Sequence, residues 1–137
     1  MSLTISERDL ERARGILGLE LPVEIVLCRT QVNPLAYWTT VGESHEIVCN
    51  SELEKLEANF VIWHELGHAQ QYEKYGDFFQ PKYAEQVVDA GFDPGDLQIG
   101  QRMELDDEQK VRYYNIPFEK EASEIARTYC DLYEVVV

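Results

Sequence analysis

The sequence predicts an α+β fold, in which helices and strands occupy separate stretches of the chain. Apolar residues recur at helical spacing near the N-terminus, from about residue 51 to residue 75, and again after Pro117. Three shorter segments alternate, or are rich in β-branched and aromatic residues, as strands are: 23–28, 37–41 and 46–49. A chain of 137 residues, of which 45% are hydrophobic, fits one globular domain over residues 1–137.

Cap and turn residues delimit the N-terminal elements. Ser6 is placed to cap the first helix, which is expected to end at Gly18. Gly42 begins a turn between the second and third predicted strands, so residues 36–49 are expected to form a β-hairpin.

The long middle helix is expected to begin in a capping box formed by Ser51 and Glu54 and to end at Gly76. Gly67 lies inside this helix, where glycine costs about 1 kcal/mol relative to alanine. We expect the compensating benefit to be close packing of a neighbouring element against the helix at this residue.

Residues 77–116 show the weakest pattern, and a connection this long is more often functional than inert. From there the expected elements are a short helix at Lys82–Ala90, a turn at Asp93–Asp96, a stretch of mixed character at Leu105–Tyr114, and a final helix from Pro117 to about Tyr133. Asn115 is the candidate cap of that final helix.

The middle helix carries the pattern H-E-x-x-H, in which His64 and His68 lie four residues apart and Glu65 follows the first histidine. Residues i and i+4 project from one face of a helix, so both imidazoles can bind one cation. Glu65 lies close enough to take a proton from a metal-bound water. The pattern is the signature of zinc metalloproteases, and one Zn²⁺ ion is the expected cofactor. A chance pair of structural histidines is the alternative interpretation.

A catalytic zinc usually takes three protein ligands and leaves one position for water. His45, the third histidine of the chain, lies beside the predicted hairpin turn and is expected at the surface or facing substrate. A carboxylate of the final helix is the better candidate. Glu119 shares its helix face with the small residues Ala122 and Ala126, whereas Glu121 lies about 200° round the helix and is the alternative ligand.

With the H-E-x-x-H pattern followed downstream by Glu119-x-x-Ala122, the chain resembles the gluzincin metallopeptidases. It is similar especially to small bacterial and phage zincin-like domains and to repressor-cleaving and damage-response peptidases. The resemblance implies a minimal zincin fold, with a small, mostly antiparallel sheet packed on the motif helix and a C-terminal helix, and it maps the third zinc ligand to Glu119. Many gluzincins have Asp or Asn four residues after that ligand, where this chain has Ser123, so the resemblance implies weaker orientation of a ligand histidine.

The activity implied by the resemblance is hydrolysis of a peptide bond by a metal-activated water, with Glu65 as general base. An extended peptide would pair with the edge of the hairpin at residues 36–49. Tyr113 and Tyr114 precede the final helix and are candidate oxyanion donors, although aromatic packing is the commoner role of such residues. The alternative function is a catalytically idle zinc-binding protein with a structural or regulatory role.

Composition narrows the expected partners. With 26 acidic and 12 basic residues the net charge is −14, which disfavours nucleic acid and anionic membranes and leaves a peptide or protein substrate.

Cys28, Cys49 and Cys130 are widely spaced, which argues against a disulfide framework or a cysteine zinc site. There is no apolar run of about 18 residues and no secretory signal pattern, so a cytoplasmic protein is expected.

Overall fold

The computed structural model of the protein describes residues 3–29, 35–93 and 105–137. Its elements are α1 (Glu7–Leu17), β1 (Val23–Cys28), β2 (Ala36–Val41), β3 (Ser44–Asn50), α2 (Lys55–Tyr75), the 3₁₀ helix η1 (Gly76–Phe78), α3 (Phe79–Asp89), α4 (Asp107–Tyr114) and α5 (Pro117–Tyr129). The predicted α+β class is confirmed. In the described part of the chain, no helix has the length and apolar character needed to cross a membrane.

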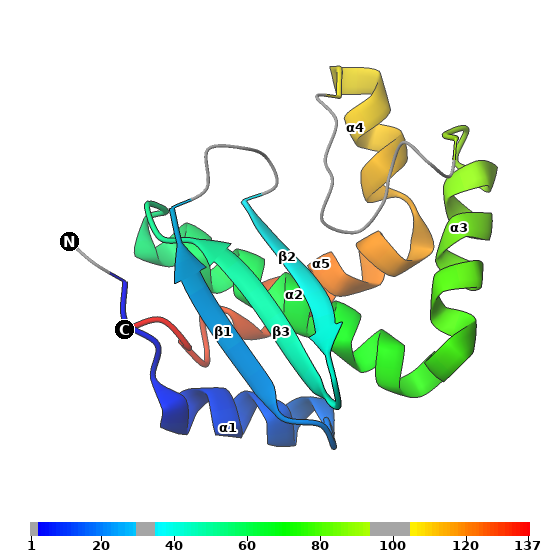
Figure 1. Ribbon diagram of the computed structural model, residues 1–137. Helices are drawn as coiled ribbons and strands as arrows, with labels where there is room; N and C mark the ends of the chain where they lie inside the picture. Colours follow the sequence, from blue (N-terminus) through cyan, green and yellow to red (C-terminus); the bar gives the residue numbers. More distant parts are fainter. Residues whose placement is uncertain (1–2, 30–34, 94–104) are drawn as a thin grey trace.

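The described strands form one sheet in the order β1-β3-β2 (Figure 1). β2 and β3 pair as an antiparallel hairpin, as predicted, whereas β1 pairs with β3 in parallel. The sheet is therefore mixed rather than mostly antiparallel. Because β3 lies in the centre with a strand on each side, its consecutive apolar residues Ile47, Val48 and Cys49 are all buried.

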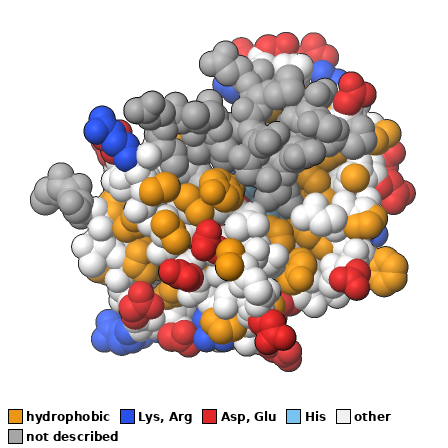
Figure 2. Space-filling model, viewed as in Figure 1, with side chains coloured by type: hydrophobic (Ala, Val, Ile, Leu, Met, Phe, Trp, Pro, Cys, Tyr) orange, Lys and Arg blue, Asp and Glu red, His pale blue; other side chains and the backbone are white. Residues whose placement is uncertain are grey.

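Helix α2 crosses one face of the sheet, and α5 packs against α2 rather than against the strands (Figure 1). The main core fills the space between the sheet and α2, with Trp38 and Ile47 on one side and Ile62 and Leu66 on the other. The opposite face of the sheet is turned toward the viewer in Figure 2, where hydrophobic side chains lie among acidic ones. The motif helix is thus held between the sheet and a second helix.

Close packing of α2 on α5 depends on Gly67. A Cβ atom at this position would lie 3.0 Å from Cα and 3.1 Å from Cβ of Ala122 on α5. Both distances are shorter than an ordinary carbon–carbon contact, so any larger residue would push the two helices apart. The expectation that a neighbouring element approaches Gly67 closely is confirmed.

The predicted caps at Ser6, Gly18 and Gly76 are confirmed, but the predicted start of α2 is wrong. The helix begins at Lys55 instead of forming a capping box at Ser51. The side chain of Asn50 accepts the N–H of Glu52 at 3.0 Å and holds these residues in a turn. Local bonds of this kind compete with a helix start.

The irregular part of the sequence contains more helix than its pattern indicated. The predicted helix at Lys82–Ala90 extends from Phe79 to Asp89, and Leu105–Tyr114 contains α4, which a capping box at Asp106 begins. Asn115 does not cap α5: its amide donates to the carbonyl of Val111 at 2.9 Å and so ends α4. Helix α5 ends at Tyr129, short of the predicted Tyr133. The predicted turn at Asp93–Asp96 extends outside the described residues.

Asn59 of α2 binds the C-terminal segment, Val135 and Val136, through hydrogen bonds of its side chain. Its Nδ2 donates to the carbonyl of Val136 at 3.1 Å, and its Oδ1 accepts the backbone N–H groups of Val135 and Val136 at 2.8 and 2.9 Å. The indole of Trp63 donates to the carbonyl of Tyr133 at 2.8 Å. Helix α2 therefore holds the sheet, α5 and the chain end together.

The contact at Gly67 predicts the effect of adding one methyl group. Gly67→Ala is expected to lower the free energy of unfolding by about 1–3 kcal/mol, because the strain of overpacking exceeds the gain in helix propensity. Gly15→Ala in α1 is the matched control, since nothing lies within 4 Å of its added Cβ, and it should stabilise by up to about 1 kcal/mol. Urea unfolding of the two variants measures both values. Stabilisation by Gly67→Ala would contradict the tight packing.

Candidate metal centre

Three potential ligand atoms converge between α2 and α5. His64 and His68 lie one turn apart on α2 with ring centroids 4.9 Å apart. The Nε2 atoms of both rings lie 2.9 Å from the same oxygen, Oε1 of Glu119, in the first turn of α5. His64, Glu65 and His68 also form a group whose potential ligand atoms lie within 4.8 Å of one another. Two imidazoles and a carboxylate are a ligand set that suits zinc.

Glu119 is almost fully buried, and its second oxygen is also bound. Oε2 accepts the hydroxyl of Tyr83 at 2.6 Å and that of Tyr113 at 3.0 Å. Burial alone would raise the pKa of Glu119, but the charge of His68 and hydrogen bonds from both histidines outweigh it and hold the pKa well below its usual range. The carboxylate is therefore ionised and ready to bind a cation.

The tautomer of His68 follows from its neighbour Gln71. The Nε2 of Gln71 donates to the carbonyl of Phe118 at 2.9 Å and to Glu121 at 3.1 Å, which turns the amide oxygen toward His68. That oxygen lies 2.9 Å from Nδ1 of His68 and can only accept, so Nδ1 carries a proton. The outer ring nitrogen, Nε2, is left to bind a metal, as is usual for ligand histidines.

His64 is oriented in a similar way by Ser123 of α5. Its Nδ1 lies 3.1 Å from the serine hydroxyl. The hydroxyl occupies the position where the resemblance leads us to expect Asp or Asn, and it supplies a hydrogen bond without a negative charge. Both candidate histidine ligands therefore have a polar partner on the ring nitrogen that faces away from Glu119.

Glu65 lies beside the ligands but points toward β2. It is 8% exposed, and the backbone N–H of Trp38 on that strand favours its charged form. Burial raises the pKa of Glu65 and the charge of Glu119 adds to the rise, while His68, His64 and the bond from Trp38 oppose it. A raised pKa makes a carboxylate a stronger base, which suits an acceptor of protons near neutral pH.

The remaining candidates lie in different surroundings. Glu121 is exposed and bonded to Gln71, so the geometry supports Glu119 rather than Glu121 as third ligand. The hydroxyl of Tyr113 donates to the carboxylate of the candidate ligand Glu119, and Tyr114 is 46% exposed and meets the ring of Tyr113 edge-on. His45 is fully buried, and the expectation of a surface position beside the turn is wrong.

Sequence reasoning missed two residues of the site. Gln71 lies three residues after His68 on the same helix face, so its spacing was a usable signal. Tyr83 gave no such signal, because only the packing of α3 against α5 brings its hydroxyl to Glu119. Burial and the charge of Glu119 raise the pKa of Tyr83, so it stays protonated and donates.

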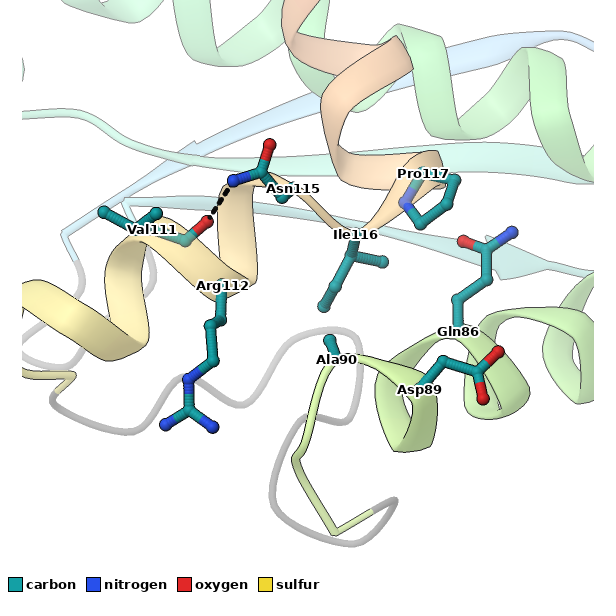
Figure 3. Close-up of a pocket in the computed structure, with 8 residues that line it drawn as sticks. All are labelled: Gln86, Asp89, Ala90, Val111, Arg112, Asn115, Ile116 and Pro117. Carbon is teal, nitrogen blue, oxygen red and sulfur yellow. Dashed lines mark hydrogen bonds between the residues drawn. The ribbon is translucent and has the colours of Figure 1, made fainter.

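A separate pocket of about 390 Å³ lies where α3, α4 and the start of α5 meet (Figure 3). Its lining residues are Gln86, Asp89, Ala90, Val111, Arg112, Asn115, Ile116 and Pro117. None of the candidate metal ligands is among them. In Figure 3 the charged groups of Arg112 and Asp89 point away from each other, so the pocket does not gather charge as the candidate metal centre does.

Comparisons of the chain with protein-family models, with curated proteins and with solved structures find no match.

The convergence on Glu119 predicts which carboxylate binds metal. Glu119→Gln is expected to weaken zinc binding more than about a hundredfold, since it removes a ligand, whereas Glu121→Gln should change it less than about tenfold. Competition with a chelating dye measures both affinities, and anomalous diffraction at the zinc edge should place the ion at His64, His68 and Glu119. A larger loss from Glu121→Gln would reverse the assignment.

Zinc binding is also expected to depend on pH. Burial alone would lower the pKa of His68, but the charge and hydrogen bond of Glu119 raise it to about 9 in the metal-free protein. Below that pH the proton on Nε2 must leave before metal binds, so apparent affinity should rise with pH until about 9. Calorimetry at neutral pH in two buffers of different ionisation enthalpy counts the released protons. Identical enthalpies of zinc binding in the two buffers would show that no proton is released and would contradict the expected pH dependence.

Proposed function

We propose that the protein is a zinc-dependent peptidase. The observation that carries the proposal is the convergence of both histidine Nε2 atoms on one oxygen of Glu119, with Glu65 adjacent to the first histidine. His64, His68 and Glu119 would hold the ion as three protein ligands, a number that leaves a position for water. A site that serves structure alone is usually closed by four protein ligands and has no need of Glu65.

When bound, zinc lowers the pKa of a water ligand and polarises the carbonyl of the scissile peptide bond. Glu65 then acts as general base: it accepts the proton that the attacking water releases and passes it to the leaving amine. Its raised pKa supports both transfers, because a carboxyl group with a pKa nearer neutrality takes and returns a proton more readily.

The edge of β2 is the proposed binding surface for an extended peptide. Among the described strands β2 lies at the sheet edge, beside α2. The N–H of Asn50 donates to the carbonyl of Leu35, which fixes the alternation of hydrogen bonds along the hairpin. By that alternation the backbone groups of Ala36, Trp38 and Thr40 point away from β3. A peptide strand added there would run past Glu65.

Tyr113 is the proposed donor to the oxyanion of the transition state. Its hydroxyl lies 3.0 Å from Oε2 of Glu119 and so borders the proposed metal position. Tyr83 also donates to that oxygen at 2.6 Å, but it is almost fully buried and is better suited to hold Glu119 in place. In this proposal Tyr113 stabilises the developing negative charge, and Tyr83 orients the carboxylate of Glu119.

The decisive test separates zinc binding from hydrolysis. Glu65→Gln is expected to bind zinc within about tenfold of the wild-type affinity and to lose at least about a hundredfold in hydrolysis rate, because only the proton acceptor is removed. Glu57→Gln, on an exposed position of the same helix, is the matched control and should retain full activity. Cleavage of a broad peptide library by the zinc-loaded proteins is followed by mass spectrometry.

Two outcomes would contradict the proposal. If the zinc-loaded wild type and Glu65→Gln are equally inert on the library, the catalytically idle zinc-binding alternative is favoured. If the wild type does not bind zinc, the H-E-x-x-H pattern is a structural pair of histidines.

A further inference from the structure

A series of buried hydrogen bonds runs from Glu73 of α2 through His45 of β3 to Trp38 of β2, whose backbone N–H favours the charged form of Glu65. Its centre is His45, which is 0% exposed. Nε2 of this ring lies 2.6 Å from Oε2 of Glu73, and Nδ1 lies 3.0 Å from the indole nitrogen of Trp38. An indole N–H can only donate, so Nδ1 of His45 accepts, and Nε2–H donates to Glu73. The two partners therefore fix the tautomer of His45.

The Glu73 end of the series is anchored. Its Oε1 accepts the backbone N–H of Glu20 at 2.7 Å, and its Oε2 accepts that of Leu21 at 3.4 Å. These residues connect α1 to β1, so Glu73 has donors from this connection and from β3. A carboxylate held from several directions gives His45 a fixed point of attachment on α2.

The Trp38 end leads to the proposed general base. The indole packs against Tyr72 and Phe79, with ring centroids 5.3 and 5.5 Å away. By the alternation of hydrogen bonds along the hairpin, the backbone N–H of the same residue points away from β3, on the strand that packs against α2. This N–H favours the charged form of the Glu65 carboxyl and so acts to lower its pKa. Fixing the side chain of Trp38 therefore also fixes the backbone donor that acts on the Glu65 carboxylate.

We propose that His45 is a positioning residue for Glu65, acting through Trp38. The imidazole hydrogen bonds to none of the candidate ligands, and it reaches the proposed substrate edge through the indole of Trp38. It sets the position of β2 relative to α2, and with it the orientation of the Glu65 carboxylate. The catalytic consequence rests on the proposed peptidase function, whereas the structural link between His45 and Glu65 does not. Small displacements of a catalytic group cost much rate, so the effect on turnover should be measurable.

Two substitutions of His45 test the link. His45→Gln keeps both bonds, because an amide oxygen accepts from the indole and an amide nitrogen donates to Glu73. His45→Leu keeps comparable bulk but makes neither bond. On the best peptide substrate, His45→Leu should lower kcat by about tenfold to a hundredfold with zinc affinity nearly unchanged, and His45→Gln should stay within about threefold of wild type. A role in stability alone would not produce this rescue at full zinc occupancy.

A spectroscopic readout tests the link without activity. In nitrogen–proton correlation spectra, Glu65→Gln should shift the backbone amide of Trp38 in the wild-type and His45→Gln backgrounds but not in His45→Leu. Tyr72→Phe is the control, because it changes the same aromatic cluster without breaking the series. If His45→Leu does not fold, Trp38→Phe breaks the series at the indole, and the amide of residue 38 should again fail to respond to Glu65→Gln.

An amide of residue 38 that responds to Glu65→Gln equally in all backgrounds would overturn the positioning role, even if the protein is an active peptidase. An amide that never responds would do the same. Conversely, absence of hydrolysis by the wild type would overturn the proposed function and leave the spectroscopic result as the test of this link.

Discussion

Enclosure of one carboxylate between two helices is the constraint on which the rest of the structure depends. A charge buried as deeply as Glu119 is unfavourable unless donors surround it. Two imidazoles of α2 and the phenols of Tyr83 and Tyr113 provide these donors, so a single side chain links α2, α3, α4 and α5. The helices come close enough only because Gly67 faces Ala122. In the proposed holoprotein, a cation would take the place of the protons that now hold the imidazoles to Glu119.

The sequence was most informative where the chemistry is local. His64 and His68 could be placed together from helix geometry alone, and the small residues beside Glu119 favoured it over Glu121 before any tertiary contact was known. The fold class followed from periodicity for the same reason. Tyr83 could not be found, because its role arises from packing between segments distant in the chain. His45 was misplaced because a residue beside a turn is ordinarily exposed, and nothing local indicated that Glu73 receives it in the core.

Helix α2 carries several buried polar side chains whose partners lie on other parts of the structure. Asn59 binds the C-terminal segment, Glu65 meets β2, His68 meets α5, and Gln71 connects His68 to the start of α5. Apolar packing alone tolerates small shifts between elements, whereas hydrogen bonds between buried groups do not. The polar residues of α2 therefore fix how the sheet, α5 and the chain end are aligned.

The attachment of the C-terminal segment to Asn59 has a consequence for local motion. Chain ends usually fray, and their amide protons exchange with solvent almost at the intrinsic rate. Here, release of Val135 and Val136 would leave the buried amide side chain of Asn59 without these partners, so the segment at Val135 and Val136 and helix α2 are expected to open together. The amide protons of Val135 and Val136 are therefore expected to exchange together with those of α2 rather than at the rate of frayed residues.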